Sequence, residues 1–171
     1  MNITYRKAEP SDAAALLEYL KTVGGESNNL MFGAGGIPIT EEQEKTLLEN
    51  YADSPHSRTF LAVDGDKIVG NSTVDGRNNP RISHRRNIAI SVLRDYWGRG
   101  VGSGLMQCMV DFAKSTGAEV LSLEVLSDNA RAIALYRKFG FESFGTFKKF
   151  FKIDGEYFDA DYMTCDLTGA R

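Results

Sequence analysis

The chain has 171 residues and a formal net charge of −3, and 42% of its residues are hydrophobic while 25% are charged. This length and composition are typical of one globular domain, here spanning residues 1–171, with a core that needs no disulfides. The acidic balance argues against a nucleic-acid-binding protein, which usually shows a strong local excess of Lys and Arg.

Cysteines and histidines are few and scattered. Cys108 and Cys165 lie outside any CxxC pair, which predicts reduced thiols in a cytoplasmic protein. Neither His56 nor His84 has a partner at metal-ligand spacing, so we expect no metal. No stretch approaches the roughly 20 apolar residues that a membrane helix needs, and Met1–Arg6 is polar and strand-like. We therefore expect no membrane partner.

The N-terminal third predicts a strand and two helices. Asn2–Lys7 is predicted to be a strand, and the Glu9-Pro10-Ser11-Asp12 segment opens a helix that should end near Lys21. Residues 23–38 contain five glycines and show no regular pattern. Thr40-Glu41-Glu42-Gln43 then has the form of a capping box, which predicts a helix to about Tyr51.

The middle of the chain alternates strands with a helix. Arg58–Val63 and Lys67–Val74 flank Asp64-Gly65-Asp66, a hairpin signal. A further strand is predicted at Arg86–Val92, and an amphipathic helix follows the glycines after it. Glu119–Leu126 reads as a buried strand.

The C-terminal third predicts a helix and a hairpin. Asp128–Phe139 is the helix, ended by Gly140. Phe141–Ile153 and Tyr157–Asp166 are the last two strands. The complete order, β-α-α-β-β-β-α-β-α-β-β, predicts a mixed α+β fold with about seven strands and four helices. Only the central part, residues 86–139, suits a parallel crossover; both ends look antiparallel, so the fold is not doubly wound.

A glycine-rich turn separates the strand at 86–92 from the next helix. Glycines occupy every second position from Gly98 to Gly104, directly after Trp97. Such glycines let the main chain approach a ligand, and the unpaired N–H groups of a helix start bind anions such as pyrophosphate. Arg99 could add charge-assisted hydrogen bonds. A turn that merely packs helix on sheet is the simpler interpretation, but four glycines exceed what one turn needs.

The glycine spacing fits neither of two common phosphate motifs. No Lys follows the glycines as GxxxxGK[ST] requires, and GxGxxG fails because the spacing here is GxGxGxG. Glu124 does lie 20 positions after Gly104, where a dinucleotide fold places an acidic residue. A dinucleotide-binding module therefore stays open as an alternative.

Three polar side chains follow the turn. Glu124 lies in the middle of an apolar strand, where a carboxylate is costly unless it is ion-paired, solvated in a cleft or protonated. In a cleft it would be suited to act as a general base. Asn129 and Tyr136 lie at positions i and i+7 of the next helix, on one face. Asn129 either caps that helix or binds a ligand, and Tyr136 is either a core aromatic or a reactive phenol.

The order of elements and three strings of residues resemble the GCN5-related N-acetyltransferase (GNAT) superfamily. The strings are the turn at 92–105, Leu123-Glu124-Val125, and Asn129-x-x-Ala132-x-x-Leu135-Tyr136-x-x-x-Gly140-Phe141. Glu124 and Tyr136 have the relative placement of the base and acid in ribosomal-protein alanine N-acetyltransferases. The tail from Lys148 to Met163 is more similar to bacterial acetyltransferases that act on amino acids or peptides.

The resemblance implies an acyltransferase of the EC 2.3.1 type that moves an acetyl group from acetyl-CoA to a primary amine in a ternary complex. The thioester would lie in a V-shaped gap between the strands at 86–92 and 119–126. Glu124 would be the general base, and Tyr136 would protonate the departing thiolate. The implied contacts of acetyl-CoA are Ile90, Ser91, Val92, Gly98, Arg99, Gly100, Val101, Gly102, Ser103, Gly104 and Asn129.

One position departs from the family pattern. The turn usually begins with Gln or Arg, but this chain has Trp97 there. The main-chain donors should survive this change, whereas a side-chain contact to the phosphates is lost or is supplied by Arg99.

The acceptor implied by the resemblance is an amino acid, a peptide N-terminus or another small amine. The first two helices, their link and the final hairpin should hold it, and Glu26 and Glu41 could attract its ammonium group. A homodimer is a family expectation. A non-catalytic acyl-CoA sensor would need neither Glu124 nor Tyr136, so the presence of both favours an enzyme.

Overall fold

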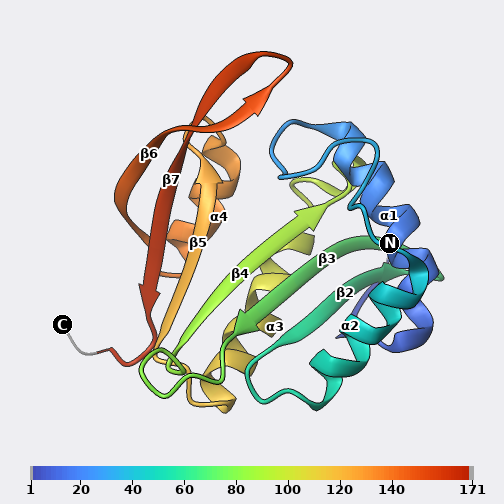
Figure 1. The fold of residues 1–171 in the computed structure, drawn as a ribbon, viewed down its shortest axis with the longest axis horizontal. Coiled ribbons are helices and arrows are strands. Elements are labelled where there is room, and N and C mark those ends of the chain that lie inside the picture. The colour runs from blue at the N-terminus through green and yellow to red at the C-terminus, as the bar shows by residue number, and fades with distance from the viewer. Residues whose placement is uncertain (1, 170–171) are drawn as a thin grey trace.

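The computed structural model describes residues 2–169 and places their strands in one seven-stranded sheet, in the order β1-β2-β3-β4-β5-β7-β6 (Figure 1). The helices and strands are β1 (Ile3–Lys7), α1 (Ala13–Glu26), α2 (Glu41–Asp53), β2 (Arg58–Asp64), β3 (Lys67–Gly76), β4 (Arg85–Val92), α3 (Val101–Ser115), β5 (Val120–Leu126), α4 (Ala130–Lys138), β6 (Glu142–Ile153) and β7 (Glu156–Asp166).

The order of elements predicted from the sequence is confirmed, as is the mixed and mostly antiparallel sheet. Of the pairs of neighbouring strands in the sheet, only β4 and β5 run parallel. The predicted hairpin between β2 and β3 turns at Gly65, where φ is +63°. The hairpin between β6 and β7 turns at Asp154 and Gly155, both with positive φ, as a type I′ turn demands.

The first long helix is longer than predicted. It continues through Gly24 and Gly25 to Glu26 rather than ending near Lys21. These glycines are not helix breakers, because a side chain at Gly24 would lie 2.2 Å from the carbonyl oxygen of Gly33. The absence of a side chain thus lets the link between α1 and α2 pack directly on the helix.

Helices cover both faces of the sheet. In Figure 1, α1 and α2 lie in front of the first strands, and α3 crosses behind β3 and β4. Gly70 on β3 allows α3 to approach closely, since a Cβ there would lie 2.9 Å from Leu105 and 3.2 Å from Val101. The buried apolar residues of the two layers form one core cluster around the β2–β5 strands.

The sheet opens in its middle. Strands β4 and β5 are paired only at their beginnings, from Arg85 with Val120 to Asn87 with Ser122. Beyond Asn87, β4 stays paired with β3, and β5 stays paired with β7. The two halves of the sheet therefore diverge, and the second half of each strand borders a gap.

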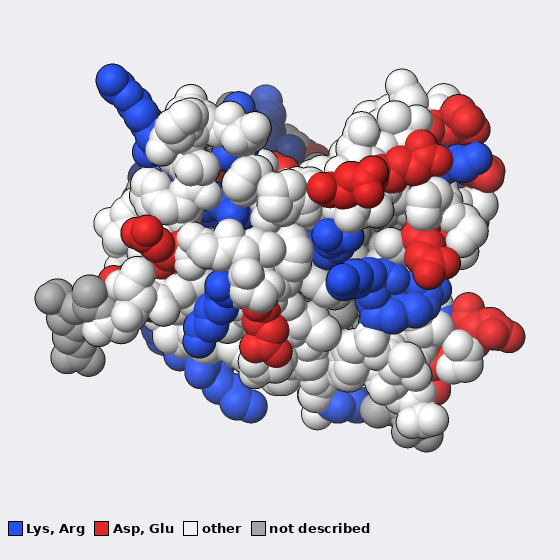
Figure 2. Space-filling view, turned by 90° about the horizontal axis from the view of Figure 1, so that it is seen from below, with Lys and Arg blue, Asp and Glu red and all other residues white. Residues whose placement is uncertain are grey.

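The surface shows no extended region of one charge on the face seen in Figure 2, where acidic and basic side chains are interspersed. Among residues 2–169, no group of three His, Cys, Asp or Glu side chains is placed to hold a metal ion. Within the same residues, no helix has both the length and the apolarity needed to cross a membrane. The expectations of no metal and no nucleic-acid partner stay predictions.

Glu44 on α2 is a buried carboxyl group without a partner. Its side chain is 3% exposed, and its Oε2 atom has no hydrogen-bond partner within the described chain. Burial raises the pKa of this carboxyl group. The pKa of Glu44 is therefore higher in the folded than in the unfolded protein. The fold has its full stability at acidic pH, where this group is protonated, and loses part of it as the pH rises and the buried group ionises.

Replacing Glu44 with Gln is therefore expected to raise the melting temperature at pH 7–8 and to change it little near pH 4. Each kcal/mol gained corresponds to roughly 2–4 °C for a protein of this size. The measurement is thermal unfolding from pH 4 to 8. Glu49→Gln, at an exposed position of the same helix, is the matched control. An equal gain at both ends of the pH range would contradict the assignment.

Candidate active site

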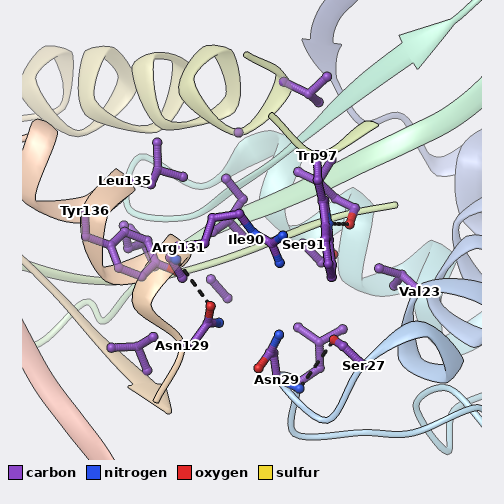
Figure 3. Close-up of a pocket in the computed structure, with 18 of the residues that line it drawn as sticks. Val23, Ser27, Asn29, Ile90, Ser91, Trp97, Asn129, Arg131, Leu135 and Tyr136 are labelled. Atoms are coloured by element: carbon purple, nitrogen blue, oxygen red, sulfur yellow. Dashed lines mark hydrogen bonds between the residues drawn. The ribbon is translucent and has the colours of Figure 1, made fainter. Parts of the chain in front are cut away.

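The gap between β4 and β5 contains a cavity of about 730 Å³ (Figure 3). Its walls come from the second half of β4, from β5, from the N-terminal turn of α3, from the length of α4, and from the segment at 27–32 after α1. Segments far apart in the sequence thus meet here because the sheet divides at this point.

The backbone of β4 presents hydrogen-bonding groups to this cavity. The N–H of Leu93 donates to the Val69 carbonyl on β3 at 3.0 Å. Alternate amides of an extended strand point to opposite sides, so the N–H groups of Ile90 and Val92 point away from β3 and into the gap. No β5 backbone pairs with them, because the β4–β5 ladder ends at Asn87. They are available to a ligand that enters between the strands.

The start of α3 supplies a second set of free amides. Gly100 is the N-cap residue with φ +84°, a left-handed conformation that favours glycine. The first intrahelical bond runs from the Gly104 N–H to the Gly100 carbonyl, at 3.0 Å. Within residues 2–169, the amides of Val101, Gly102 and Ser103 have no acceptor. This helix start therefore suits a phosphate or diphosphate group.

Eleven of the thirteen site residues predicted from the sequence line this one cavity, while Arg99 and Gly104 do not. Arg99 lies over the ring of Tyr96, 5.9 Å from its centroid. A Cβ at Gly104 would lie 2.1 Å from the ring of Tyr5, so this glycine lets α3 pack against β1. Their assignment as contacts of acetyl-CoA stays a prediction without support from the cavity's shape.

Ser91 connects the cavity wall to α1. Its hydroxyl shares a hydrogen bond of 3.0 Å with the hydroxyl of Tyr19, which is 5% exposed. Side chains of β4 alternate, so Ser91 faces α1 while Ile90 faces α3, near Gly102. The side chain of Ser91 is therefore held by the protein, and the main chain is the part of this residue that is free to contact a ligand.

Glu124 is half-buried on the wall formed by β5. Ser122 pairs with Asn87, so Ser122 and Glu124 lie on the same sheet face as Asn87 and Ser91, the face covered by α1. Within the described chain, no Lys or Arg forms an ion pair with the Glu124 carboxylate, and no donor binds it. The ion pair that the sequence left open is thus absent there, and the carboxylate faces the cavity.

Tyr136 reaches the same cavity from α4, on the opposite face of the sheet. The residue is 6% exposed and its ring packs 5.9 Å from that of Phe141. Burial raises the pKa of its phenol, which keeps the hydroxyl protonated. No residue from 2 to 169 forms a hydrogen bond with this hydroxyl. Tyr136 is therefore a protonated phenol facing the cavity.

Asn129 has the capping role that was one of its two interpretations. Its Oδ1 atom accepts the N–H of Ala132 at 3.2 Å and starts α4, two residues later than predicted (Figure 3). Asn129 itself also lines the cavity. Its free amide nitrogen leaves a contact with a ligand open, and that contact stays a prediction.

Arg131 is a cavity residue that was not predicted, and it lines the wall from the first turn of α4. Residues between 27 and 32 and Phe151 also form part of the wall, and they lie in the link and the final hairpin that were expected to hold the acceptor. Arg131 had a signal in the sequence, because a cation in the first turn of a helix opposes the helix dipole. Within the link, no single residue from 27 to 32 stood out, because this segment shows no regular pattern.

Two acidic residues suggested for the acceptor lie elsewhere. The Glu26 carboxylate accepts the N–H of Arg94 at 2.7 Å. Glu41 borders a separate hollow of about 330 Å³ between α1 and the link that follows it. Neither residue lines the large cavity, so the expectation that they attract the acceptor's ammonium group stays a prediction without support from the cavity's shape.

Taken together, the cavity has an anion-binding helix start, a strand with free amides, an unpaired carboxylate and a protonated phenol. An acyl thioester with a phosphorylated carrier could extend from the α3 start along β4. A nucleophile that approaches from the α1 face would meet Glu124, and a leaving group on the other face would meet Tyr136. This arrangement suits acyl transfer to an amine.

Comparison with known proteins agrees with this chemistry. The acetyltransferase (GNAT) family model matches residues 29–141. The L-amino acid N-acetyltransferase AaaT of Escherichia coli is 41% identical over 129 residues, which are 74% of this chain and 79% of that protein. The N-alpha-acetyltransferase RimI of Mycobacterium tuberculosis is 34% identical over 104 residues, covering 60% of this chain and 63% of that protein. A GNAT-family acetyltransferase structure from Streptococcus pneumoniae has a TM-score of 0.92 and 30% identity, covering 95% of this chain and 98% of that one.

The chain therefore belongs to the GNAT family of acetyltransferases. It is an acetyl-CoA-dependent N-acetyltransferase, as the resemblance of its motifs implied. The dinucleotide alternative fails on the fold, because the parallel sheet it requires is absent and β4 and β5 are the one parallel pair in the seven-stranded sheet.

Proposed function

We propose that the protein acetylates the α-amino group of a free L-amino acid, with Glu124 as general base and Tyr136 as general acid. One observation carries this proposal. The Glu124 carboxylate and the Tyr136 phenol line the same cavity, and neither has a hydrogen-bond or ion-pair partner within the described chain. The similarity to AaaT, which extends over most of both chains, supports a free amino acid as the acceptor.

Acetyl-CoA would supply the activated acetyl group from the α3 side of the gap. Its diphosphate would accept hydrogen bonds from the amides of Val101, Gly102 and Ser103. Its pantetheine arm would lie along β4 and bind the free N–H groups of Ile90 and Val92. One of these amides would also stabilise the oxyanion that forms on the thioester carbonyl.

The acceptor amine would enter from the α1 face. Primary amines are mostly protonated at pH 7, because their pKa values range from about 7.7 to 10.4. Glu124 would accept the amine proton, and the neutral nitrogen would attack the carbonyl carbon. As the carbon–sulfur bond breaks, the sulfur would take a proton from the Tyr136 hydroxyl, and the acetylated nitrogen would release its excess proton, which restores the Tyr136 phenol. The proton on Glu124 would leave to solvent. The products are the N-acetyl amino acid and the free thiol of CoA.

The acceptor's side chain would contact the segment after α1. Leu30, Met31 and Phe32 present apolar side chains to the cavity, and Phe151 adds an aromatic ring from the final hairpin. Met31 is 70% exposed, which leaves this wall accessible to an incoming molecule. Such a wall favours uncharged acceptor side chains.

Three further features belong to the same proposal. The chain works as one domain over residues 1–171, since one sheet includes strands from both ends. It acts in the cytoplasm, which fits two free cysteines. It forms a homodimer, and the exposed aromatic residues Phe144, Phe147 and Tyr157 of the β6–β7 hairpin offer apolar surface for it.

The proposal is tested first by ligand stabilisation. Acetyl-CoA at 100 times its Kd is expected to stabilise the protein by about 2.7 kcal/mol, whereas NAD should not. Acetylation of free amino acids, N-terminal peptides, polyamines and aminoglycosides is then followed by release of the CoA thiol. We expect the highest kcat/KM for a free amino acid with an uncharged side chain. A preference for peptides or polyamines would overturn the acceptor, and acetyl-CoA binding without any turnover would indicate a sensor.

A further inference from the structure

Trp97 and Arg131 form a stacked pair inside the cavity wall (Figure 3). The Arg131 Cζ atom lies 3.3 Å from the centroid of the Trp97 ring. The indole Nε1–H donates to the Val92 carbonyl at 2.7 Å. The ring is therefore fixed to β4 at one edge, and its face holds the guanidinium group.

The charge of this pair is not balanced. Arg94 lies over the same ring, 5.6 Å from its centroid, and Arg131 is in the first turn of α4. Within residues 2–169, Arg131 has no carboxylate partner. The pKa of Arg131 is lowered by desolvation first and by the charge of Arg94 second. Two cations and a helix start thus gather at one place in the described chain, and an anion would offset their repulsion.

We propose that Arg131, held flat against Trp97, binds a phosphate group of acetyl-CoA. This inference rests on the proposed function, because it uses the same donor. It also explains the departure at position 97: the side-chain contact that Gln or Arg would make from the turn comes instead from α4, with Trp97 as its platform. Arg131 is the binding residue and Trp97 is a positioning residue.

The geometry suits an arginine and a tryptophan. A guanidinium group can stack on an aromatic face and still donate from its edges, because its five N–H groups lie in its own plane. Those edges form paired, charge-assisted hydrogen bonds with phosphate oxygens. Lysine cannot combine these two contacts. The Val92 carbonyl, which points into the gap like the Val92 amide, is satisfied by the indole and does not compete for the ligand.

Acetyl-CoA carries two kinds of phosphate, the diphosphate and the 3′-phosphate, and a series of donors separates them. Kinetics of the wild type, Arg131→Met and Arg137→Met are measured with acetyl-CoA, with dephospho-acetyl-CoA and with S-acetyl-pantetheine. Arg137 is the matched control, since it is exposed on the same helix and does not line the cavity. Trp97→Leu is assayed in the same way.

For Arg131→Met we expect KM for acetyl-CoA to rise about tenfold or more with kcat nearly unchanged, a size typical of hydrogen bonds to charged groups. With S-acetyl-pantetheine, which has no phosphate, the variant and the wild type should be equal. If the rise in KM of Arg131→Met persists with dephospho-acetyl-CoA, Arg131 binds the diphosphate. If it disappears with that donor, Arg131 binds the 3′-phosphate. Trp97→Leu should show the same dependence on the donor. An equal loss with all three donors, or none with acetyl-CoA, overturns the inference.

Binding of CoA can also be measured in the absence of catalysis. Trp97 is the one tryptophan of the chain, so its fluorescence reports directly on the stacked pair. We expect CoA to change this emission in the wild type and in Arg137→Met, and to bind Arg131→Met about tenfold more weakly. Equal affinity in all three overturns the role of Arg131 and leaves the proposed function intact. Failure of CoA to bind the wild type overturns both.

Discussion

Replacing Tyr136 with Phe is expected to lower kcat about 100-fold and to leave the affinity for acetyl-CoA nearly unchanged. Within the described chain, the Tyr136 phenol is the one group that we propose as proton donor to the departing sulfur. General acid catalysis typically contributes 10²–10⁴-fold to the rate. The fold should persist, because the ring still packs against Phe141 and the lost hydroxyl leaves no described group without its hydrogen bond. Steady-state kinetics and a CoA titration measure the two quantities.

Two further comparisons make this test specific. Tyr157→Phe, at an exposed position near the start of β7, is the control and should behave as the wild type. Because the Tyr136 pKa is raised, the kcat of the wild type should show no decline from ionisation of this phenol between pH 7 and 9. Unchanged turnover of Tyr136→Phe would end the assignment as general acid, whatever the pH profile.

The second large effect concerns Glu124. Glu124→Gln preserves the shape of the side chain but removes its ability to accept a proton, so kcat/KM at pH 7 should fall about 100-fold. The deficit should narrow towards pH 9.5, because a growing fraction of the acceptor amine is then neutral without a base. The measurement is kcat/KM for the acceptor across this pH range.

The decrease of the kcat/KM deficit with rising pH distinguishes a general base from a residue with a structural role. A carboxylate that merely orders β5 would give a loss that is independent of pH. Glu119→Gln, at an exposed position just before β5, is the control for the change of charge. A deficit of Glu124→Gln that stays constant up to pH 9.5 would count against the general base.

Much of the fold follows from local patterns. Alternating apolar residues defined the strands, and the glycines at 65 and 155 marked the hairpins because tight hairpin turns require positive φ at one or both central residues. The end of α1 could not be read in this way. Gly24 looks like a helix breaker, but its small size serves a contact with Gly33, nine residues later, that only the folded chain reveals.

The candidate site was predictable to a different extent. Glu124 and Tyr136 stood out as a carboxylate in an apolar strand and an aromatic on an amphipathic face, and the family resemblance joined them in one gap. The divergence of β4 and β5 depends on where their pairing ends, which residue patterns do not encode. The contact of Trp97 with Arg131 joins residues 34 positions apart across two helix starts, so no local spacing indicates it.

The early end of the β4–β5 pairing has a consequence for the behaviour of the chain among other proteins. Unpaired strand edges at the rim of a sheet invite strands from neighbouring molecules, and proteins must protect them. Here the unused backbone groups of Ile90 and Val92 lie in the interior, with α1 on one side and α3 on the other. A thin, flexible molecule can reach them, and we expect the flanking helices to hinder pairing with a strand of another molecule. The protein can thus offer open backbone to its substrate without inviting aggregation.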